Sequence, residues 1–109
     1  MADRLHAPPL TALPWPGVEI RLLVTLQSVA AAGSFSLAAR RLGYTQSAVS
    51  GQITALERAV GVRLVDRVRG ARSVELTPEG DALMAHAVAI TTHLAAAHAE
   101  FETLQRTLP

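Results

Sequence analysis

The sequence contains no cysteine, and this absence removes several classes of protein at once. Without cysteine there is no disulfide scaffold, no thiolate nucleophile and no cysteine-ligated zinc site. Aromatic residues make up only 4% of the chain and charged residues 17%, whereas half of the residues are hydrophobic. High hydrophobicity with little charge argues against intrinsic disorder, and 109 residues are typical of one domain with its own core.

Long apolar runs are also missing. No stretch reaches the ~20 apolar residues that a membrane span requires, because charged or polar residues interrupt each run. The first ten residues contain no continuous apolar core of the kind found in secretory signals. These absences predict a soluble cytoplasmic protein without a membrane partner.

Lysine is absent as well, so all ten cations are arginines, and they are distributed unevenly. Residues 18–76 hold eight arginines and four acidic residues, a net charge of +4. Residues 77–109 hold one arginine and four acidic residues, a net charge of −3. A basic segment followed by an acidic one is expected when only the first meets a polyanion.

Proline separates the first part of the chain from the rest. Four of the six prolines lie within residues 1–17. Because proline is excluded from helix interiors, this part is predicted to be an N-terminal extension. The remainder is predicted to form a small globular unit, residues 18–76, followed by a long helix, residues 77–109.

Helical periodicity begins at residue 18, where apolar residues start to recur at spacings of three and four. Glycines end three such segments, and hydroxyl residues able to cap a helix precede two of them. The predicted helices run from residue 18 to just before Gly33, from 37 to 42 with Ser34 or Ser36 as cap, and from 46 to 60 with Thr45 as cap.

The third predicted helix has two unlike faces. One is an apolar stripe of Val49, Ile53, Leu56 and Val60, and the other holds Ser47, Ser50, Gly51, Thr54 and Arg58. A solvent-exposed face usually carries better helix formers, so these small hydrogen-bonding groups indicate close approach to a polar partner. A short helix, a tight turn and a second helix form a helix-turn-helix, whose second helix enters the DNA major groove. The alternative is an ordinary helical bundle with solvated polar side chains.

A β-hairpin is predicted after the third helix. Two short alternating segments, 63–68 and 73–76, flank a turn that contains glycine. Arginines lie at or near the tip of this hairpin. We assign the wing to residues 67–76. The predicted fold is therefore mostly α: a winged helix-turn-helix of three helices and a hairpin wing, followed by a long C-terminal helix.

The last helix starts with a strong signal, because Thr77 can cap it, Pro78 suits its first position and acids follow in the first turn. Extending to Leu108, it would be ~46 Å long, too long to bury its apolar face on a head of 60 residues. We therefore predict a homodimer through a heptad-like seam. The seam consists of Leu83, Ala87, Ile90, Leu94, Ala97, Phe101, Leu104 and Leu108.

Several motifs together resemble the N-terminal domain of LysR-type transcriptional regulators. They are GSFSLAARRL at 33–42, TQSAVSGQI at 45–53, LE at 56–57, GVRL at 61–64, DR at 66–67 and LTPEG at 76–80. The resemblance covers the chain from about Val18 onward. It implies a winged helix-turn-helix, a dimer through the long linker helix, and control of transcription by binding to promoter DNA.

The predicted DNA contacts combine the residue chemistry with this resemblance. Glutamine can pair with adenine through two hydrogen bonds, and serine with either base type, so Gln46, Ser47 and Ser50 are predicted to meet bases. By resemblance, Ser34, Arg40, Arg67 and the wing arginines would meet the DNA backbone. The full predicted set is Ser34, Arg40, Thr45, Gln46, Ser47, Ser50, Thr54, Arg67, Arg69 and Arg72.

The sequence also departs from the family pattern. Gly51 stands where the family usually has arginine, Val65 replaces a usual phenylalanine, and the hairpin is somewhat long. Family members usually continue into a two-lobed effector-binding domain, which these 109 residues do not include. We therefore expect a small-molecule effector only if such a domain follows.

Other chemistry is weakly indicated. His86, His93 and His98 lack the i, i+4 spacing typical of helical metal ligands, and no catalytic motif is present. The sequence thus predicts no metal, no cofactor and no enzymatic activity. The competing functional hypothesis is a protein-interaction module that dimerises through the last helix and binds DNA weakly or not at all.

Overall fold

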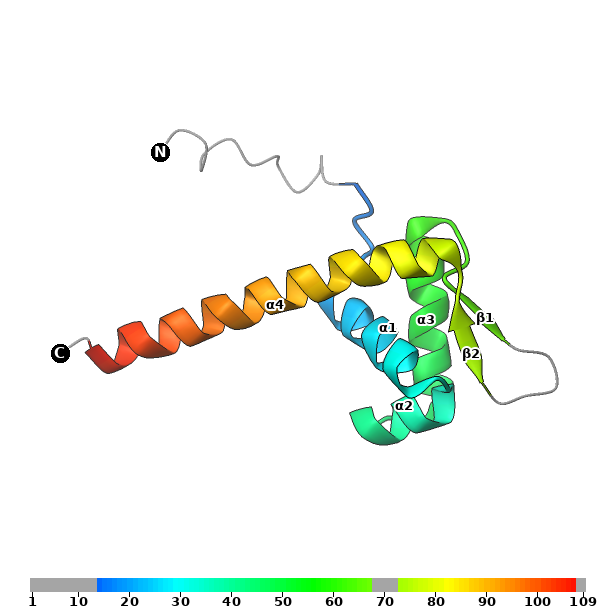
Figure 1. The fold of residues 1–109 in the computed structure, drawn as a ribbon, viewed down its shortest axis with the longest axis horizontal. Helices are drawn as coiled ribbons and strands as arrows, with labels where there is room; N and C mark the ends of the chain where they lie inside the picture. The colour runs from blue at the N-terminus through cyan, green and yellow to red at the C-terminus, as the bar shows by residue number, and fades with distance from the viewer. Residues whose placement is uncertain (1–13, 68–72, 108–109) are drawn as a thin grey trace.

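The computed structural model describes residues 14–67 and 73–107, which form a helical head with a hairpin and a long helix that extends from it (Figure 1). The elements in chain order are α1 (Ile20–Ala32), α2 (Phe35–Leu42), α3 (Gln46–Val60), β1 (Val65–Arg67), β2 (Val74–Leu76) and α4 (Pro78–Thr107). This arrangement confirms the predicted winged helix-turn-helix with a long C-terminal helix.

The helix boundaries follow local hydrogen bonds. The predicted bounds of α3 are confirmed, but α2 begins at Phe35, two residues before the predicted start. The reason is that Ser34 is the cap, since its Oγ accepts a hydrogen bond from the Leu37 amide at 3.1 Å. The first helix begins at Ile20, because the Val18 amide is engaged in a turn with the Trp15 carbonyl, at 2.9 Å.

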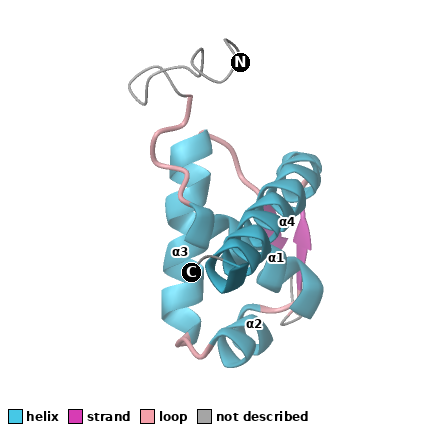
Figure 2. Ribbon diagram, turned by 90° about the vertical axis from the view of Figure 1, so that its left-hand side faces the viewer, coloured by secondary structure: helices cyan, strands magenta, loops and turns pink. Residues whose placement is uncertain are grey.

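The hydrophobic core lies between α1, α2, α3 and the first turns of α4. Figure 2 shows α4 crossing α1, with α3 and α2 around them. The buried apolar residues are Leu22, Leu23, Leu26, Val29, Phe35, Ala38, Ala39, Val49, Ile53, Leu56, Leu64, Val65, Leu83 and Ala87. Thr25 is a buried polar residue within this packing, and its hydroxyl donates a hydrogen bond to the Gln52 side chain, joining α1 to α3.

The strands β1 and β2 pair antiparallel, with Val65 opposite Leu76 and Arg67 opposite Val74. The predicted hairpin is thus confirmed, although its pairing begins at Val65 and not at Arg67. The Val74 amide also donates to the Gly33 carbonyl at 2.9 Å, so the hairpin is attached to the end of α1. The predicted wing residues Arg69 and Arg72 lie outside the described residues.

The junction between the hairpin and α4 is tightly built. The Thr77 hydroxyl accepts a hydrogen bond from the Gly80 amide at 2.9 Å and donates to the Arg63 carbonyl at 2.8 Å. Gly80 is buried, and a Cβ atom at this position would overlap the backbone carbonyl of Leu64. Only glycine therefore lets the first turn of α4 approach the segment that precedes β1.

The long helix α4 is buried only at its beginning. Leu83 and Ala87 pack in the core of their own protomer, so their assignment to the dimer seam is corrected: they stabilise the head. From Ile90 onward the described seam residues are exposed, and Leu108 lies outside the described residues. The head alone thus does not cover the apolar face of α4.

By length and composition alone, α4 is long and apolar enough to cross a membrane, which corrects the expectation that no segment approaches this size. Its many alanines raise the mean hydropathy although they bury little area. Core helices of soluble proteins reach the same length and composition, so these two properties alone do not identify a membrane span.

Candidate nucleic-acid interface

The turn between α2 and α3 lies on the side of the head away from α4 (Figure 1). Gly43 ends α2 with a φ of +73°, a left-handed conformation that side chains other than glycine rarely adopt. The Tyr44 amide then donates to the Ala39 carbonyl at 2.9 Å, and the Thr45 hydroxyl accepts from the Ala48 amide at 3.1 Å. These bonds fix the direction in which α3 leaves the turn.

The first turn of α3 projects polar groups into solvent. Thr45, Gln46 and Ser47 are exposed, and Gly51 leaves open space one turn later. The free amide groups and the dipole at a helix N-terminus favour an anion such as a phosphate. An amide side chain and a hydroxyl beside such a terminus are suited to read base edges while the backbone is held.

Arg67 connects the wing to both helices of the helix-turn-helix. Its guanidinium carbon lies 4.9 Å from the centroid of the Phe35 ring, and its Nη2 donates to Ser50 Oγ at 3.2 Å. Arginine is a donor only, so the Ser50 hydroxyl accepts this bond and keeps its own hydrogen available for an external acceptor. The structure therefore brings together two predicted DNA contacts, Ser50 and Arg67.

Three other predicted residues lie in different environments. Ser34 is half-buried, and its Oγ accepts the hydrogen bond that caps α2. In the predicted phosphate contact, the same hydroxyl would therefore donate its hydrogen to the phosphate while its oxygen caps the helix. Thr54 is exposed, and its hydroxyl donates to the Ser50 carbonyl at 3.0 Å. Arg40 is exposed in the last turn of α2.

Several arginines around this face are exposed. Among the described residues, Arg40, Arg41, Arg58 and Arg67 form no ion pair, whereas Arg63 pairs with Asp66 at 3.3 Å. The acid on α3, Glu57, is turned toward the protein backbone, where its carboxylate accepts from the Leu64 amide at 2.8 Å. The helix-turn-helix side of the head thus presents positive charge.

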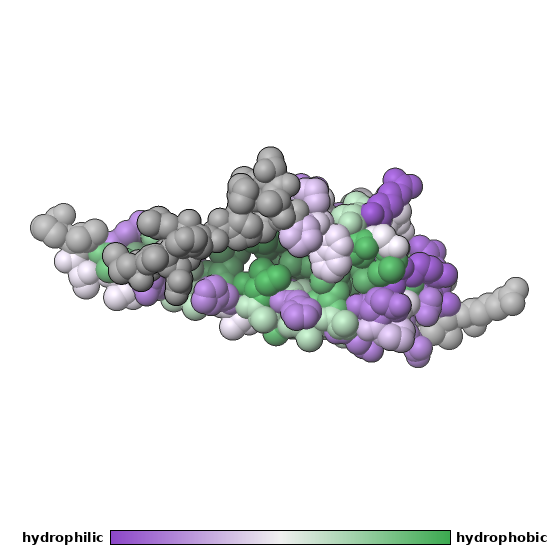
Figure 3. Space-filling view, turned by 90° about the horizontal axis from the view of Figure 1, so that it is seen from above, coloured by the Kyte–Doolittle hydropathy of each residue, from purple (hydrophilic) through white to green (hydrophobic). Residues whose placement is uncertain are grey.

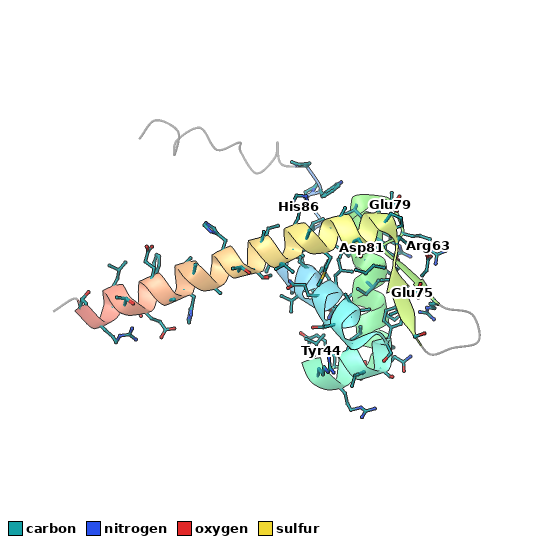
Figure 4. The ribbon with its side chains drawn as sticks, viewed as in Figure 1. Tyr44, Arg63, Glu75, Glu79, Asp81 and His86 are labelled. Atoms are coloured by element: carbon teal, nitrogen blue, oxygen red, sulfur yellow. The ribbon has the colours of Figure 1, made fainter. Side chains whose placement is uncertain are left out.

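Two residues of this face were not among the predicted contacts. Tyr44 is 48% exposed in the turn, and Arg41 is exposed on α2. Figure 4 places Tyr44 at the end of the head opposite Glu79 and His86, which lie along α4. Tyr44 is the only tyrosine of the chain and directly precedes the cap residue Thr45. That position in the sequence could have indicated its exposure beside the start of α3.

The histidines of α4 lie away from this face. His98 Nδ1 is 3.0 Å from the Glu102 carboxylate, one helical turn later, and His86 lies on the first part of the helix. Within residues 14–67 and 73–107, no three histidines or carboxylates are grouped in a way that could hold a metal ion.

The amino-acid sequence of this chain is similar to those of bacterial transcriptional regulators. The family model described as "Bacterial regulatory helix-turn-helix protein, lysR family" matches residues 20–81. An uncharacterized HTH-type transcriptional regulator in the ibpB-leuC intergenic region of Azotobacter vinelandii is 49% identical over 77 residues, which cover 71% of this chain and 52% of that protein. The regulator TfdT of Cupriavidus pinatubonensis is 46% identical over 63 residues, which cover 58% of this chain and 27% of TfdT. The chain thus matches about half of one relative and about a quarter of the other.

Solved structures share the fold. The crystal structure of a CbnR_DBD–DNA complex is 32% identical with a TM-score of 0.74, and the match covers 81% of this chain and 99% of that chain. A complex of BenM_DBD with benA site 1 DNA is 28% identical with a TM-score of 0.76, covering 84% and 100% of the two chains. The match to the crystal structure of CbnR, a LysR family transcriptional regulator, covers 78% of this chain but only 29% of the CbnR chain.

Proposed function

Because this chain belongs to the bacterial regulatory helix-turn-helix proteins of the lysR family, we propose that it binds duplex DNA sequence-specifically as a homodimer and thereby regulates transcription. The observation that carries this proposal is the exposed N-terminal turn of α3, with Gln46 and Ser47, beside arginines that form no ion pair within the described residues. The solved DNA complexes of similar domains support it.

In the proposed complex, α3 enters the major groove and Gln46, Ser47 and Ser50 contact base edges. Arg40 and Arg67 neutralise phosphates on either side, and Thr45, Ser34 and Thr54 contribute hydroxyl groups near the backbone. Residues 18–76 are the DNA-binding unit, and the chain from residue 77 onward is the linking and dimerising part. This role requires no metal, cofactor or catalytic residue. A protein with this role would act in the cytoplasm, bound to DNA.

The exposed stripe of α4 supports the proposed homodimer. Ile90, Leu94, Phe101 and Leu104 are 43–61% exposed on one face of the helix. A helix that crosses a membrane is apolar on all sides, whereas the opposite side of α4 carries Thr92 and other polar residues. A one-sided stripe fits a second helix better than lipid, and two-fold pairing presents two recognition helices to two half-sites.

The test is fluorescence anisotropy with duplex DNA from the region upstream of the gene, against a scrambled duplex of equal length and composition. We expect tighter binding to the upstream duplex, with both affinities falling as salt rises, because phosphate contacts release counterions. Absence of binding to any upstream fragment at low salt would refute the proposal and favour the protein-interaction module.

A further inference from the structure

A side-chain hydrogen bond joins α3 to the first strand of the hairpin. Arg67 Nη2 donates to Ser50 Oγ at 3.2 Å, although the two residues are 17 positions apart in the sequence. Arg67 is the last residue of β1, and hydrophilic residues gather at the end of the molecule that holds the strands, whereas hydrophobic ones gather at its middle (Figure 3). The bond therefore links a proposed base-reading residue to a proposed phosphate-binding residue at the polar end of the head.

Arg67 is held by a second contact that leaves most of its donors available. Its guanidinium carbon lies 4.9 Å from the centroid of the buried Phe35 ring, within the range of cation–π attraction. A guanidinium carries several N–H donors in a rigid plane, and the bond to Ser50 uses one of them. Arg67 forms no ion pair within residues 14–67 and 73–107. It can therefore bind a phosphate oxygen without releasing Ser50.

The Ser50 hydroxyl keeps its hydrogen for an external acceptor. Its oxygen accepts from a cationic donor, and in the part of the chain that the structure describes this hydroxyl donates no hydrogen bond. Thr54, one turn later, differs, because its hydroxyl donates to the Ser50 carbonyl at 3.0 Å. Hydrogen bonds in a chain polarise one another, so the bond from Arg67 makes the Ser50 hydroxyl a stronger donor and a poorer acceptor.

The neighbours of Ser50 on α3 add no competing group. Val49 is buried in the core, and Gly51 has no side chain and leaves open space around it. Ser50 is half-buried and lies on the same helix face as the exposed Gln46 and Thr54, one turn away on either side. Base reading by this part of α3 therefore depends on the Ser50 hydroxyl, and the direction of its hydrogen bond determines which base suits it.

We propose that Arg67 positions Ser50 for base recognition and fixes the polarity of its contact: Ser50 donates its hydrogen to a base, while Arg67 donates to Ser50 and to a phosphate. The inference rests on the sequence-specific DNA binding proposed above and names a class of base for it. In the major groove, guanine, adenine and thymine present acceptors, whereas cytosine presents only an amino donor. The base that faces Ser50 is therefore guanine, adenine or thymine, and cytosine is rejected there.

Ser50→Ala locates the base in question. Anisotropy titrations on duplexes with each single-base change identify the base pair at which this variant loses the preference of the wild type. At that pair, one base analogue that lacks an acceptor (N7 of a purine, O6 of guanine or O4 of thymine) should lower wild-type affinity about two- to tenfold, the range for one hydrogen bond. The affinity of Ser50→Ala should not respond to this analogue. Wild-type affinity that is lost only when the amino group of a cytosine is removed would reverse the polarity and overturn the proposal.

A double-mutant cycle tests the positioning role of Arg67. The readout is the ratio of affinities for the preferred base and for cytosine at the Ser50 position, because the loss of a phosphate contact lowers both affinities equally and cancels. We expect Arg67→Ala to lower this ratio about as far as Ser50→Ala does, and the double variant to lower it no further. Discrimination at the base read by Gln46 should stay as in the wild type, whereas a displaced α3 would lower it as well.

Ser47→Ala is the matched control variant, since Ser47 is an exposed serine of the same helix and the Arg67 side chain bonds to Ser50 instead. Its effect on base discrimination should add to that of Arg67→Ala. Additive effects of Ser50→Ala and Arg67→Ala, or an equal fall of discrimination at the Gln46 base, would overturn the inference and leave the proposed DNA binding standing. Equal losses of Ser50→Ala on the specific and the scrambled duplex would assign the hydroxyl to a phosphate and overturn it too. Absence of binding to every upstream fragment would overturn both proposals.

Discussion

Gln46 is the first residue of α3, and its exposed side chain makes no hydrogen bond to another described residue. It can therefore reach a base without first losing a contact within the protein. We expect Gln46→Ala to weaken binding to the specific duplex by about 1–3 kcal/mol and to relax the preference at one base position. Anisotropy titrations on single-base variants of the site measure both effects.

The matched control for Gln46 is the scrambled duplex. Its affinity should change little, because the phosphate contacts of the arginines remain. Equal losses of affinity on the specific and the scrambled duplex would instead assign Gln46 to the DNA backbone.

Arg67 makes both a stacking contact and a hydrogen bond within the protein, and its charge is exposed. We expect Arg67→Ala to weaken binding to all duplexes and to reduce the slope of log affinity against log salt by about one, as for the loss of one phosphate contact. Arg67→Lys keeps the charge and should keep the slope, although it loses the planar stacking on Phe35. An unchanged slope in Arg67→Ala would place this side chain away from phosphate.

At the scale of elements, the junction of the hairpin with α4 determines how the long helix leaves the head. Thr77 caps α4 and binds the Arg63 carbonyl, and Gly80 admits the Leu64 carbonyl. The motif LTPEG at 76–80 therefore has a structural role, because each of these contacts joins α4 to the segment before β1.

We expect Gly80→Ala to destabilise the head by about 1–3 kcal/mol, since the overlapping atom belongs to the backbone and cannot turn away. Gly51→Ala is the matched control, because Gly51 lies inside α3 with open space around it. That substitution should stabilise the protein by about 0.5–1 kcal/mol through helix propensity. Urea unfolding followed by circular dichroism measures both variants, and equal stability of the two would contradict this account of the junction.

At the scale of the whole molecule, the exposed stripe of α4 requires a partner to be covered. Leu94 is 50% exposed at mid-stripe, so a charge there would be buried in the proposed dimer without a partner charge. We expect Leu94→Asp to abolish the dimer and most of the specific DNA binding while the head stays folded. Sedimentation at tens of micromolar and circular dichroism report the two properties separately.

Thr92→Asp provides the control for charge on α4, because Thr92 is exposed on the opposite side of the helix. This variant should sediment as the wild type does. A dimer that persists in Leu94→Asp, or one that is lost equally in Thr92→Asp, would remove the stripe from the interface.

Local sequence determined most of the elements of this protein. The stripe of Val49, Ile53 and Leu56, the Thr45 cap and the glycine after Val60 define α3 to the residue, because periodicity, capping and termination are all local effects. The alternating segments around the hairpin likewise predicted β1 and β2, with an error of two residues at the start of the pairing. The exposed polar face of α3 was predicted on the same basis.

Only the tertiary structure decided which apolar residues of α4 are buried in the head and which remain exposed. Heptad spacing cannot distinguish Leu83 and Ala87, which the head buries, from Ile90 and Leu94, which it leaves exposed, because the pattern is the same along α4. The contact of Arg67 with Ser50 and the position of Trp15 beside α4 join residues far apart in the chain. Such contacts depend on how the helices pack together, and no local pattern encodes that packing.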